Sequence, residues 1–532
     1  MSIYIQLQDI IKYIKQNKND CIFKISRSYQ DKIVNKSRSI DLLFHNGESI
    51  EPYTFSSSSY FNQTEELSFA YSSIKTISSN SFSNLIDLKI LILSRCQITH
   101  IESNAFINLS NLKILSLTCN HIPTIKSYLF NGLVNLEELY LNACFISKIE
   151  ENSFKDLKNL IKLDLSNNNF PKLVSFMFNG LCMLTELKLI SCSFKDIESD
   201  CFSGLENLEN LNLSINSIKL LNENVFQYLV NLKNLNMEYL KIEKIDSNSF
   251  KYLAKLKKIC LNSNNFVKII DQNMLPNINE LVELRLVGRI NETCLSNLNK
   301  LKKLNTLNLS VCYFSQMLYN GLFDEMVNLK TIILANCNIN KIEDDAFDCL
   351  INLEHLVLSY NNLRDANFDQ LLKNLINLKH LYLNGNKINW IQDYSFQNLT
   401  KLETLNLSNN DLKNTLFKKT FHGLKSLKYL NLSKCDINNL NNDLFEDNFS
   451  NLIELDLSNN NLTIIDMINF ESLLNLNILK LKSNRLNSIN VEKLFINLIN
   501  LELVDLTDNN NIQNTINLNQ ISDKFSKIKF IF

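Results

Sequence analysis

The stretch "LEELYLNACFISKIEENSFKDLKN", residues 136–159, is one copy of a pattern that recurs along most of the chain. When the copies are numbered from their opening leucines, most have apolar residues at positions 4, 6, 11 and 14 and phenylalanine at or near position 19. Position 9 is asparagine or cysteine in all but two copies, which have Leu240 and Arg289. Eighteen opening leucines, from Leu88 to Leu501, follow one another at intervals of 23 to 25 residues. Such regular spacing indicates one tandem array, not several unrelated domains.

The Leu-x-Leu core of each copy alternates with period two, which predicts a short β-strand whose leucines face one way. One copy cannot bury its own leucines, but stacked copies build a continuous core. The pattern therefore predicts an α/β solenoid with parallel strands on a concave face and with turns and short 3-10 or α segments on the convex face. The phenylalanines at position 19 are expected to stack beneath the convex side: Phe106, Phe130, Phe154, Phe178, Phe202, Phe226 and Phe250.

This pattern resembles that of the leucine-rich repeat family over about residues 64–512. The 24-residue length with a late phenylalanine is similar to the subtype common in Toll-like receptor ectodomains. The chain differs from those receptors because it shows no signal peptide and no cysteine-bonded end caps. The resemblance implies a horseshoe-shaped solenoid that binds its partners on the concave face.

Position 9 follows the strand, where the chain turns inward and leaves backbone groups that cannot pair in the sheet. A buried asparagine amide can satisfy such groups in the turns on either side. A thiol is a weaker donor but tolerates burial, so we interpret cysteine here as a substitute for the amide and not as a redox centre. The residues predicted to form this ladder are Cys96, Asn120, Cys144, Asn168, Cys192, Asn216, Asn264, Cys312, Cys337, Asn361, Asn386, Asn410, Cys435, Asn460, Asn484 and Asn509.

The two ends and one internal stretch depart from the pattern. Residues 1–39 are expected to form an N-terminal flank or cap that includes a short amphipathic helix, and residues 40–532 to form a solenoid of about 19 to 20 repeats. A degenerate repeat is predicted to open at Ile40, and a half repeat over 525–532 to place Phe525, Ile528 and Phe530 at positions 1, 4 and 6. Residues 270–303 fit either a decayed repeat or a hinge that a partner grips.

Composition narrows the function. The 54 basic and 55 acidic residues balance, so neither nucleic acid nor a membrane is expected as a partner, although a local nucleic-acid-binding patch is compatible with this balance. The sequence contains no secretory leader, no membrane-spanning stretch and an odd number of cysteines, 13, which together predict a cytoplasmic protein. Only eight glycines occur and no nucleotide-binding or hydrolase motif is found, so neither an enzyme nor a cofactor is expected.

A candidate binding surface lies on the strands. Positions 3 and 5 should point out of the concave face, where His355 and His380 fall at position 3 of neighbouring repeats, about 5 Å apart. No carboxylate or thiol is in register with them, so no zinc site is expected. Aromatic side chains give large contact areas at low entropic cost, as in interface hot spots. The candidate partner-binding residues are His355, Tyr360, His380, Tyr382 and Tyr429.

The favoured function is a non-enzymatic scaffold that binds a protein partner through its concave face. One alternative is an extracellular receptor ectodomain of the Toll-like kind without its leader or membrane segment. Another is a substrate-recognition adaptor of a ubiquitin-ligase-type complex. The "NLS" sequons at Asn212, Asn308, Asn406 and Asn431 arise from the repeat itself and do not distinguish these alternatives.

Overall fold

The computed structural model describes residues 49–55, 63–246, 248–261, 264, 280–286, 298, 300–314, 316–413, 415–445, 449–465, 470–487, 489, 494–495, 497–509, 512 and 527–532, together with the backbone of two strands within residues 21–44. The chain divides into two compact units. Unit 1 comprises Met1–Asn265 and Asn273–Glu280, and unit 2 comprises Phe266–Gln272 and Leu281–Phe532. Most of the irregular stretch 270–303 lies outside the described residues, so its predicted decay or hinge is not tested.

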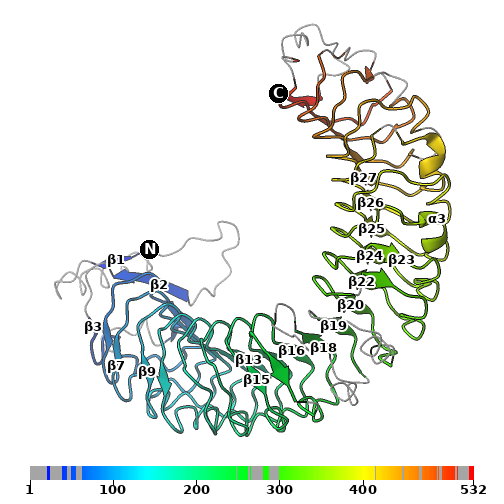
Figure 1. Ribbon diagram of the computed structural model, residues 1–532. Coiled ribbons are helices and arrows are strands. Elements are labelled where there is room, and N and C mark those ends of the chain that lie inside the picture. Colours follow the sequence, from blue (N-terminus) through cyan, green and yellow to red (C-terminus); the bar gives the residue numbers. More distant parts are fainter. Residues whose placement is uncertain are drawn as a thin grey trace. The chain divides into compact units, whose positions relative to one another are not determined.

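In unit 1, three-residue strands stack in parallel at the start of each repeat (Figure 1). Pairs of two-residue strands recur on the opposite side of the turns. The main strands are β4 (Glu66–Ser68), β6 (Ile90–Ile92), β8 (Ile114–Ser116), β10 (Glu138–Tyr140), β12 (Lys162–Asp164), β13 (Glu186–Lys188), β14 (Asn210–Asn212), β16 (Asn234–Asn236) and β18 (Lys258–Cys260). The two-residue strands are β3 (Ser49–Ile50), β5 (Thr76–Ile77), β7 (His100–Ile101), β9 (Thr124–Ile125), β11 (Lys148–Ile149), β15 (Leu220–Leu221) and β17 (Lys244–Ile245).

Unit 2 repeats the same arrangement, again with all its main strands parallel. The main strands are β19 (Glu283–Arg285), β20 (Thr306–Asn308), β22 (Thr331–Ile333), β24 (His355–Val357), β25 (His380–Tyr382), β26 (Thr404–Asn406), β27 (Tyr429–Asn431), β28 (Glu454–Asp456), β29 (Ile478–Lys480), β30 (Leu503–Asp505) and β31 (Lys529–Ile531). One pair of two-residue strands, β21 (Met317–Leu318) and β23 (Lys341–Ile342), lies on the far side of the turns.

These strands confirm the predicted parallel solenoid. On the convex side of the described residues turns dominate, and the helical segments are short, such as α3 (Phe368–Leu371) and the 3-10 helix η2 (Lys418–Phe421). None of the helices in the described parts of the chain has the length and hydropathy needed to cross a bilayer.

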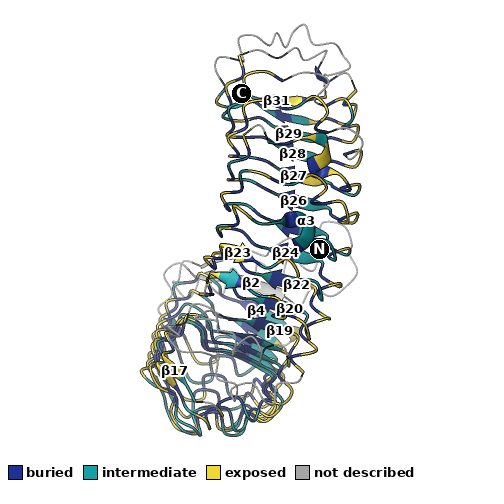
Figure 2. Ribbon diagram, turned by 45° about the vertical axis from the view of Figure 1, so that its right-hand side comes forward, coloured by how far each residue is buried: buried dark blue, intermediate teal, exposed yellow. Residues whose placement is uncertain are grey.

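The core lies between the strands and the convex turns, as the repeat pattern predicts. Side chains at positions 4 and 6 of the strands from β6 to β16 are at most 2% exposed, whereas those at positions 3 and 5 are half-buried (Figure 2). The position-19 phenylalanines stack from one repeat to the next, for example Phe130 on Phe154 with ring centroids 5.9 Å apart and Phe226 on Phe250 at 6.1 Å. Each repeat therefore completes the interior of its neighbour.

The side-chain amides of the asparagines at position 9 each join two repeats. Asn120 accepts hydrogen bonds from the amides of Cys96 (3.1 Å) and Ile98 (2.9 Å) in the preceding repeat. Its Nδ2 donates to the carbonyl oxygens of Leu93 and Leu117, both at 2.7 Å. Because the side chain is only 3% exposed, water cannot replace these four bonds.

The ladder cysteines donate their S–H groups to a carbonyl of the preceding repeat, as in Cys144 to Leu117 at 3.0 Å. Burial raises the pKa of Cys96, Cys144, Cys192, Cys337 and Cys435 to about 12. None of the described cysteines forms a disulfide. These buried, protonated thiols support the structural interpretation over the redox one.

Cysteine is nevertheless more than a substitute for the amide, because the turn around it changes. The residue after the cysteine adopts a left-handed backbone in five of the six cysteine repeats, at Gln97, Phe145, Ser193, Asn338 and Asp436. In four of the six, the cysteine carbonyl oxygen then accepts the N–H that an asparagine side chain would otherwise take, as in Ile122 N–H to Cys144 O at 2.9 Å. The backbone thus replaces the missing amide oxygen.

Replacing Cys435 by asparagine is expected to change the free energy of unfolding by less than about 1 kcal/mol. Asn386 provides the precedent, because it occupies the same ladder position ahead of a left-handed residue, Lys387, and still donates to Leu358 and Leu383. Urea denaturation followed by circular dichroism would measure the change. A loss of about 3 kcal/mol or more would show that this turn cannot hold an amide.

A second asparagine ladder, which the sequence analysis did not single out, runs along the surface just before the opening leucines. Each of these exposed or half-buried side chains donates from Nδ2 to a carbonyl of the preceding repeat, as in Asn111 to Ile86 at 2.8 Å. The frequent Asn-Leu pair at the start of each repeat is its sequence signal. Its members are Asn111, Asn135, Asn159, Asn207, Asn231, Asn328, Asn352, Asn377, Asn451, Asn475 and Asn500.

The predicted register was wrong at the N-terminal end. Ile40, in β2 (Ser39–Phe44), pairs with Leu67 and therefore takes position 4, not position 1. The stacked phenylalanine of this repeat is Phe55, whose ring lies 5.9 Å from that of Phe82. An additional strand, β1 (Cys21–Phe23), pairs antiparallel with β2, so the flank extends the sheet. The helix expected over the first residues lies outside the described residues.

The register at the C-terminal end was also wrong, by two residues. Phe530 pairs with Val504 and so takes position 4, not position 6. Ile528 is buried but precedes the strand, and Phe525 lies outside the described residues. Both errors arise because short terminal repeats lack the full set of leucines that fixes the alignment in the others.

Candidate protein-binding face

Most of the polar residues at position 5 of the strands serve the fold. In eight repeats the side-chain oxygen of Asn or Asp at this position accepts the backbone N–H two residues later, as in Asn406 to Ser408 at 3.0 Å. This bond closes the turn that leaves the strand and explains the recurring Leu-Asn-Leu-Ser sequence. The eight residues are Asp164, Asn212, Asn236, Asn308, Asn406, Asn431, Asp456 and Asp505.

Three neighbouring strands of unit 2 break this rule and create an apolar surface. β22, β24 and β25 carry Ile333, Val357 and Tyr382 at position 5, and the strand pairing places the three side by side. All three side chains are half-buried. Ile333 and Val357 were not among the predicted site residues. Their apolar side chains stand out only once the structure shows that Asn or Asp at this position closes the turn in other repeats.

Beside this surface, at position 3, His355 and His380 lie directly opposite each other on β24 and β25. Their imidazole rings stack with centroids 4.4 Å apart and planes inclined by 18°. His380 Nδ1 is hydrogen-bonded to Thr404 Oγ1 at 3.0 Å, with the donor set by the ring tautomer. Burial, and next the proximity of His380, lowers the pKa of His355, which favours the neutral form of the His355 imidazole.

Residues of alternating charge border the histidines. They occupy position 2, just before the strand, in five successive repeats. Lys379 and Lys330 both reach Glu354, at 2.6 and 3.1 Å, and their hydrogen bonds hold the pKa of Glu354 at about 2. Lys428 pairs with Glu403 at 2.9 Å and lowers the pKa of that carboxyl group. The charges are thus paired among themselves, and this border provides fixed polar contacts with little net charge.

The structure brings four of the five predicted residues onto one face and separates the fifth. Tyr429 stands in the row of His355 and His380, two strands beyond His380, and is 43% exposed. Tyr360 lies past the end of β24, in a left-handed turn, and not on the strand. Its ring occupies the space over Gly385, where an added Cβ would come within 2.6 Å of Tyr360 Cδ1.

The resulting site, here called the His–Tyr face, consists of His355, His380, Tyr429, Ile333, Val357 and Tyr382. It combines aromatic, aliphatic and imidazole side chains. On the strands next to the two histidines, no carboxylate occupies position 3 or position 5. Within the described residues, no cluster of three or more metal-ligating side chains occurs. Its aromatic and aliphatic side chains suit contact with another molecule.

Comparison with family models agrees with the repeat architecture of both units. The leucine-rich repeat model matches residues 86–146, 327–375 and 376–437, the model of the BspA-type leucine-rich repeat region matches 123–252 and 219–321, and a further leucine-rich repeat model matches 451–473. The chain is therefore a leucine-rich repeat protein. Its repeats resemble those of Toll-like receptor ectodomains. No curated protein sequence matches the chain.

Solved structures share the fold. The TLR13 chain of a TLR13–ssRNA13 complex is 26% identical with a TM-score of 0.57, over 92% of this chain and 75% of that one. A leucine-rich repeat protein of Leptospira interrogans is 23% identical with a TM-score of 0.61, over 75% and 95% of the two chains. The Drosophila Toll–Spatzle complex gives 21% identity and a TM-score of 0.65, over 88% of this chain and 64% of that one.

Proposed function

We propose that the protein is a non-enzymatic scaffold that binds a protein partner through the His–Tyr face of unit 2. The observation that carries this proposal is the unbroken row of apolar side chains, Ile333, Val357 and Tyr382, at position 5 of β22, β24 and β25, where eight other repeats carry the turn-closing Asn or Asp. The stability that those side chains give elsewhere is absent here, and half-buried apolar groups take their place. Residues that contribute to contact and not to the fold are expected at a binding surface.

The geometry of the face supports a protein as the partner. Stacked imidazoles and tyrosines provide rigid, amphipathic contact area, which is enriched in interface hot spots. The paired charges at position 2 contribute directional polar contacts at the border, as in the rim of an interface. A strongly anionic partner would find few unpaired cations here, because Lys330, Lys379 and Lys428 are bound to glutamates.

The similarity to TLR13 and Toll favours a second candidate, the ectodomain of an extracellular receptor. TLR13 is bound to RNA and Toll to Spatzle in the structures compared. In this chain the same face would receive a ligand outside the cell. The two candidates differ in location and not in the binding surface, so N-terminal sequencing and glycan analysis of protein from its native source distinguish them.

Combined replacement of His355, His380 and Tyr382 by alanine is expected to weaken capture of the partner at least tenfold, because hot-spot side chains each contribute about 1 to 2 kcal/mol. These residues are half-buried and lie outside the leucine core, so the urea midpoint should stay nearly unchanged. Quantitative affinity capture from extracts, followed by mass spectrometry, would measure the loss.

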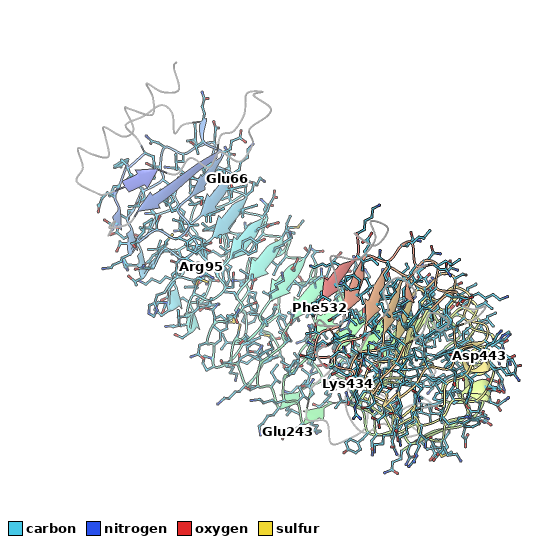
Figure 3. The ribbon with its side chains drawn as sticks, turned by 90° about the horizontal axis from the view of Figure 1, so that it is seen from above. Glu66, Arg95, Glu243, Lys434, Asp443 and Phe532 are labelled. Carbon is cyan, nitrogen blue, oxygen red and sulfur yellow. The ribbon has the colours of Figure 1, made fainter. Side chains whose placement is uncertain are left out.

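A matched control is available on the strand face of unit 1. Ile90, Ile92 and Ile114 are also half-buried apolar residues at positions 3 and 5, on β6 and β8. Glu66, on the neighbouring strand β4, marks this face in Figure 3. Combined replacement of Ile90, Ile92 and Ile114 by alanine should leave capture of the partner intact. Equal capture by wild type and the histidine–tyrosine variant would refute the proposed face.

A further inference from the structure

The two histidines of the His–Tyr face form a stacked pair of titratable rings. His355 and His380 lie opposite each other on β24 and β25, and their ring centroids are 4.4 Å apart with the planes inclined by 18°. Histidine is the side chain whose ordinary pKa, about 6.5, lies between pH 5 and pH 8. The surroundings of the pair therefore decide at which pH the face becomes charged.

The stacked geometry favours the neutral pair. Two imidazolium rings with centroids 4.4 Å apart would repel each other, so a proton on one ring opposes a proton on the other. Burial, and next the proximity of His380, accordingly lowers the pKa of His355. The two rings titrate as one coupled unit, whose second proton binds only at a lower pH than the first.

The hydrogen bond between His380 and Thr404 also depends on charge. A neutral imidazole can accept the Thr404 hydroxyl proton at Nδ1, whereas an imidazolium can only donate there. Protonation of His380 therefore fixes the direction of this bond, and the Thr404 hydroxyl must turn its own proton to another acceptor. Thr404 stands on β26 in the row of the histidines, so this rearrangement takes place on the face itself.

The charged groups at position 2 give an added proton little support, because the two glutamates there are already ion-paired. Glu354 lies between Lys379 at 2.6 Å and Lys330 at 3.1 Å, and Glu403 binds Lys428 at 2.9 Å. These five residues carry three positive charges and two negative charges. The border of the face therefore adds no net negative charge that would stabilise an imidazolium.

The strand face itself offers no closer carboxylate at positions 3 and 5. The first ones stand on β19 and β28, each three strands from the nearer histidine. The other titratable side chains of the face are Tyr382 and Tyr429, whose phenol groups gain no charge in acid. The apolar row of Ile333, Val357 and Tyr382 favours a partner that covers the face with apolar groups of its own.

We propose that the stacked histidines make partner binding at the His–Tyr face sensitive to pH: the neutral pair holds the partner near about pH 7.5, and protonation at about pH 5.5 releases it. This property belongs to the site of the proposed function and rests on that function. A partner that covers the pair removes water from the rings and lowers the pKa of His355 further. The free protein then binds more protons than the complex, so acid favours the free protein.

Affinity capture with the full chain at about pH 7.5 and about pH 5.5 tests the release. Recovery of the protein captured by wild type should fall about tenfold for each unit by which that protein lowers the pKa of His355. The matched variant, His355→Phe with His380→Phe, keeps two planar rings in register but cannot gain a proton. Its capture should be the same at both pH values, and circular dichroism checks that both proteins stay folded.

Nuclear magnetic resonance of the full chain, labelled with carbon-13 at histidine Cε1, follows the pair without any partner. The His355 signal should titrate below the ordinary value of about 6.5, and His380→Asn should move its midpoint upward, because the neighbouring charge is removed.

Three results would each overturn the proposal: undiminished capture by wild type at the acidic pH, an equal loss in the phenylalanine variant, or a His355 signal that titrates at the ordinary value or above. If wild type captures no partner even at the higher pH, the proposed function fails. The titration of His355 then decides by itself whether the pair resists protonation.

Discussion

Replacing Asn120 by alanine is expected to destabilise unit 1 by about 3 to 5 kcal/mol, the largest effect of any single ladder substitution described here. The change removes four hydrogen bonds, two accepted from Cys96 and Ile98 and two donated to Leu93 and Leu117. The backbone groups that remain are buried, so each keeps its desolvation cost without a partner. Urea denaturation followed by circular dichroism would measure the loss.

Asn111 provides the matched control for this substitution. It is an asparagine one position before the opening leucine of the same repeat, but it is exposed and makes one hydrogen bond, to Ile86. Its replacement by alanine should cost less than about 1 kcal/mol, because water can take over the carbonyl oxygen. Similar losses for the two variants would mean that burial does not decide the strength of the ladder.

Replacing Gly180 by alanine is expected to destabilise unit 1 by about 3 kcal/mol. Gly180 has a φ of +99° and lies against the preceding repeat, so an added Cβ would come within 2.5 Å of Lys155 Cα and 2.7 Å of Phe154 O. Both contacts are with backbone, which cannot rotate away, and relief requires the two repeats to separate. The shift of the urea midpoint would measure the effect.

Gly204, in the next repeat, separates the two causes. It has a similar φ of +86°, but nothing lies within 4 Å of an added Cβ. Gly204→Ala should therefore cost only the left-handed backbone strain, about 1 kcal/mol. If Gly204→Ala destabilised the protein as much as Gly180→Ala, the close approach of the turns would carry no energy, and our account of repeat spacing would be wrong.

The sequence predicted the fold closely because the same apolar positions recur in every regular repeat. A strand with apolar residues at positions 4 and 6 can bury them only against the same strand of the next repeat, and this holds from β6 to β18 in unit 1 and from β19 to β30 in unit 2. Prediction failed where the pattern was incomplete. Ile40 and Phe530 were placed in the wrong register, since few neighbouring leucines constrain them.

The candidate site was predicted in part. The spacing of His355 and His380 indicated adjacent positions, and the rings do stack at 4.4 Å. Tyr360 was expected on the same face but occupies the turn, because residues just past the strand reverse direction into a left-handed backbone. Ile333 and Val357 could be assigned to the candidate face only after the structure showed that Asn and Asp at position 5 accept a backbone N–H in other repeats.

The sequence by itself determined the solenoid, the direction of its strands and the identity of the ladder residues, because hydrophobic period and repeat length allow one stacked arrangement. Only the tertiary structure decided which polar residues are committed to backbone hydrogen bonds, how the turns at cysteines differ from those at asparagines, and that Tyr360 leaves the face on which His355 and His380 stack. Those features depend on contacts between neighbouring repeats. Such contacts are set by the turn geometry of the two repeats, which the sequence pattern does not specify.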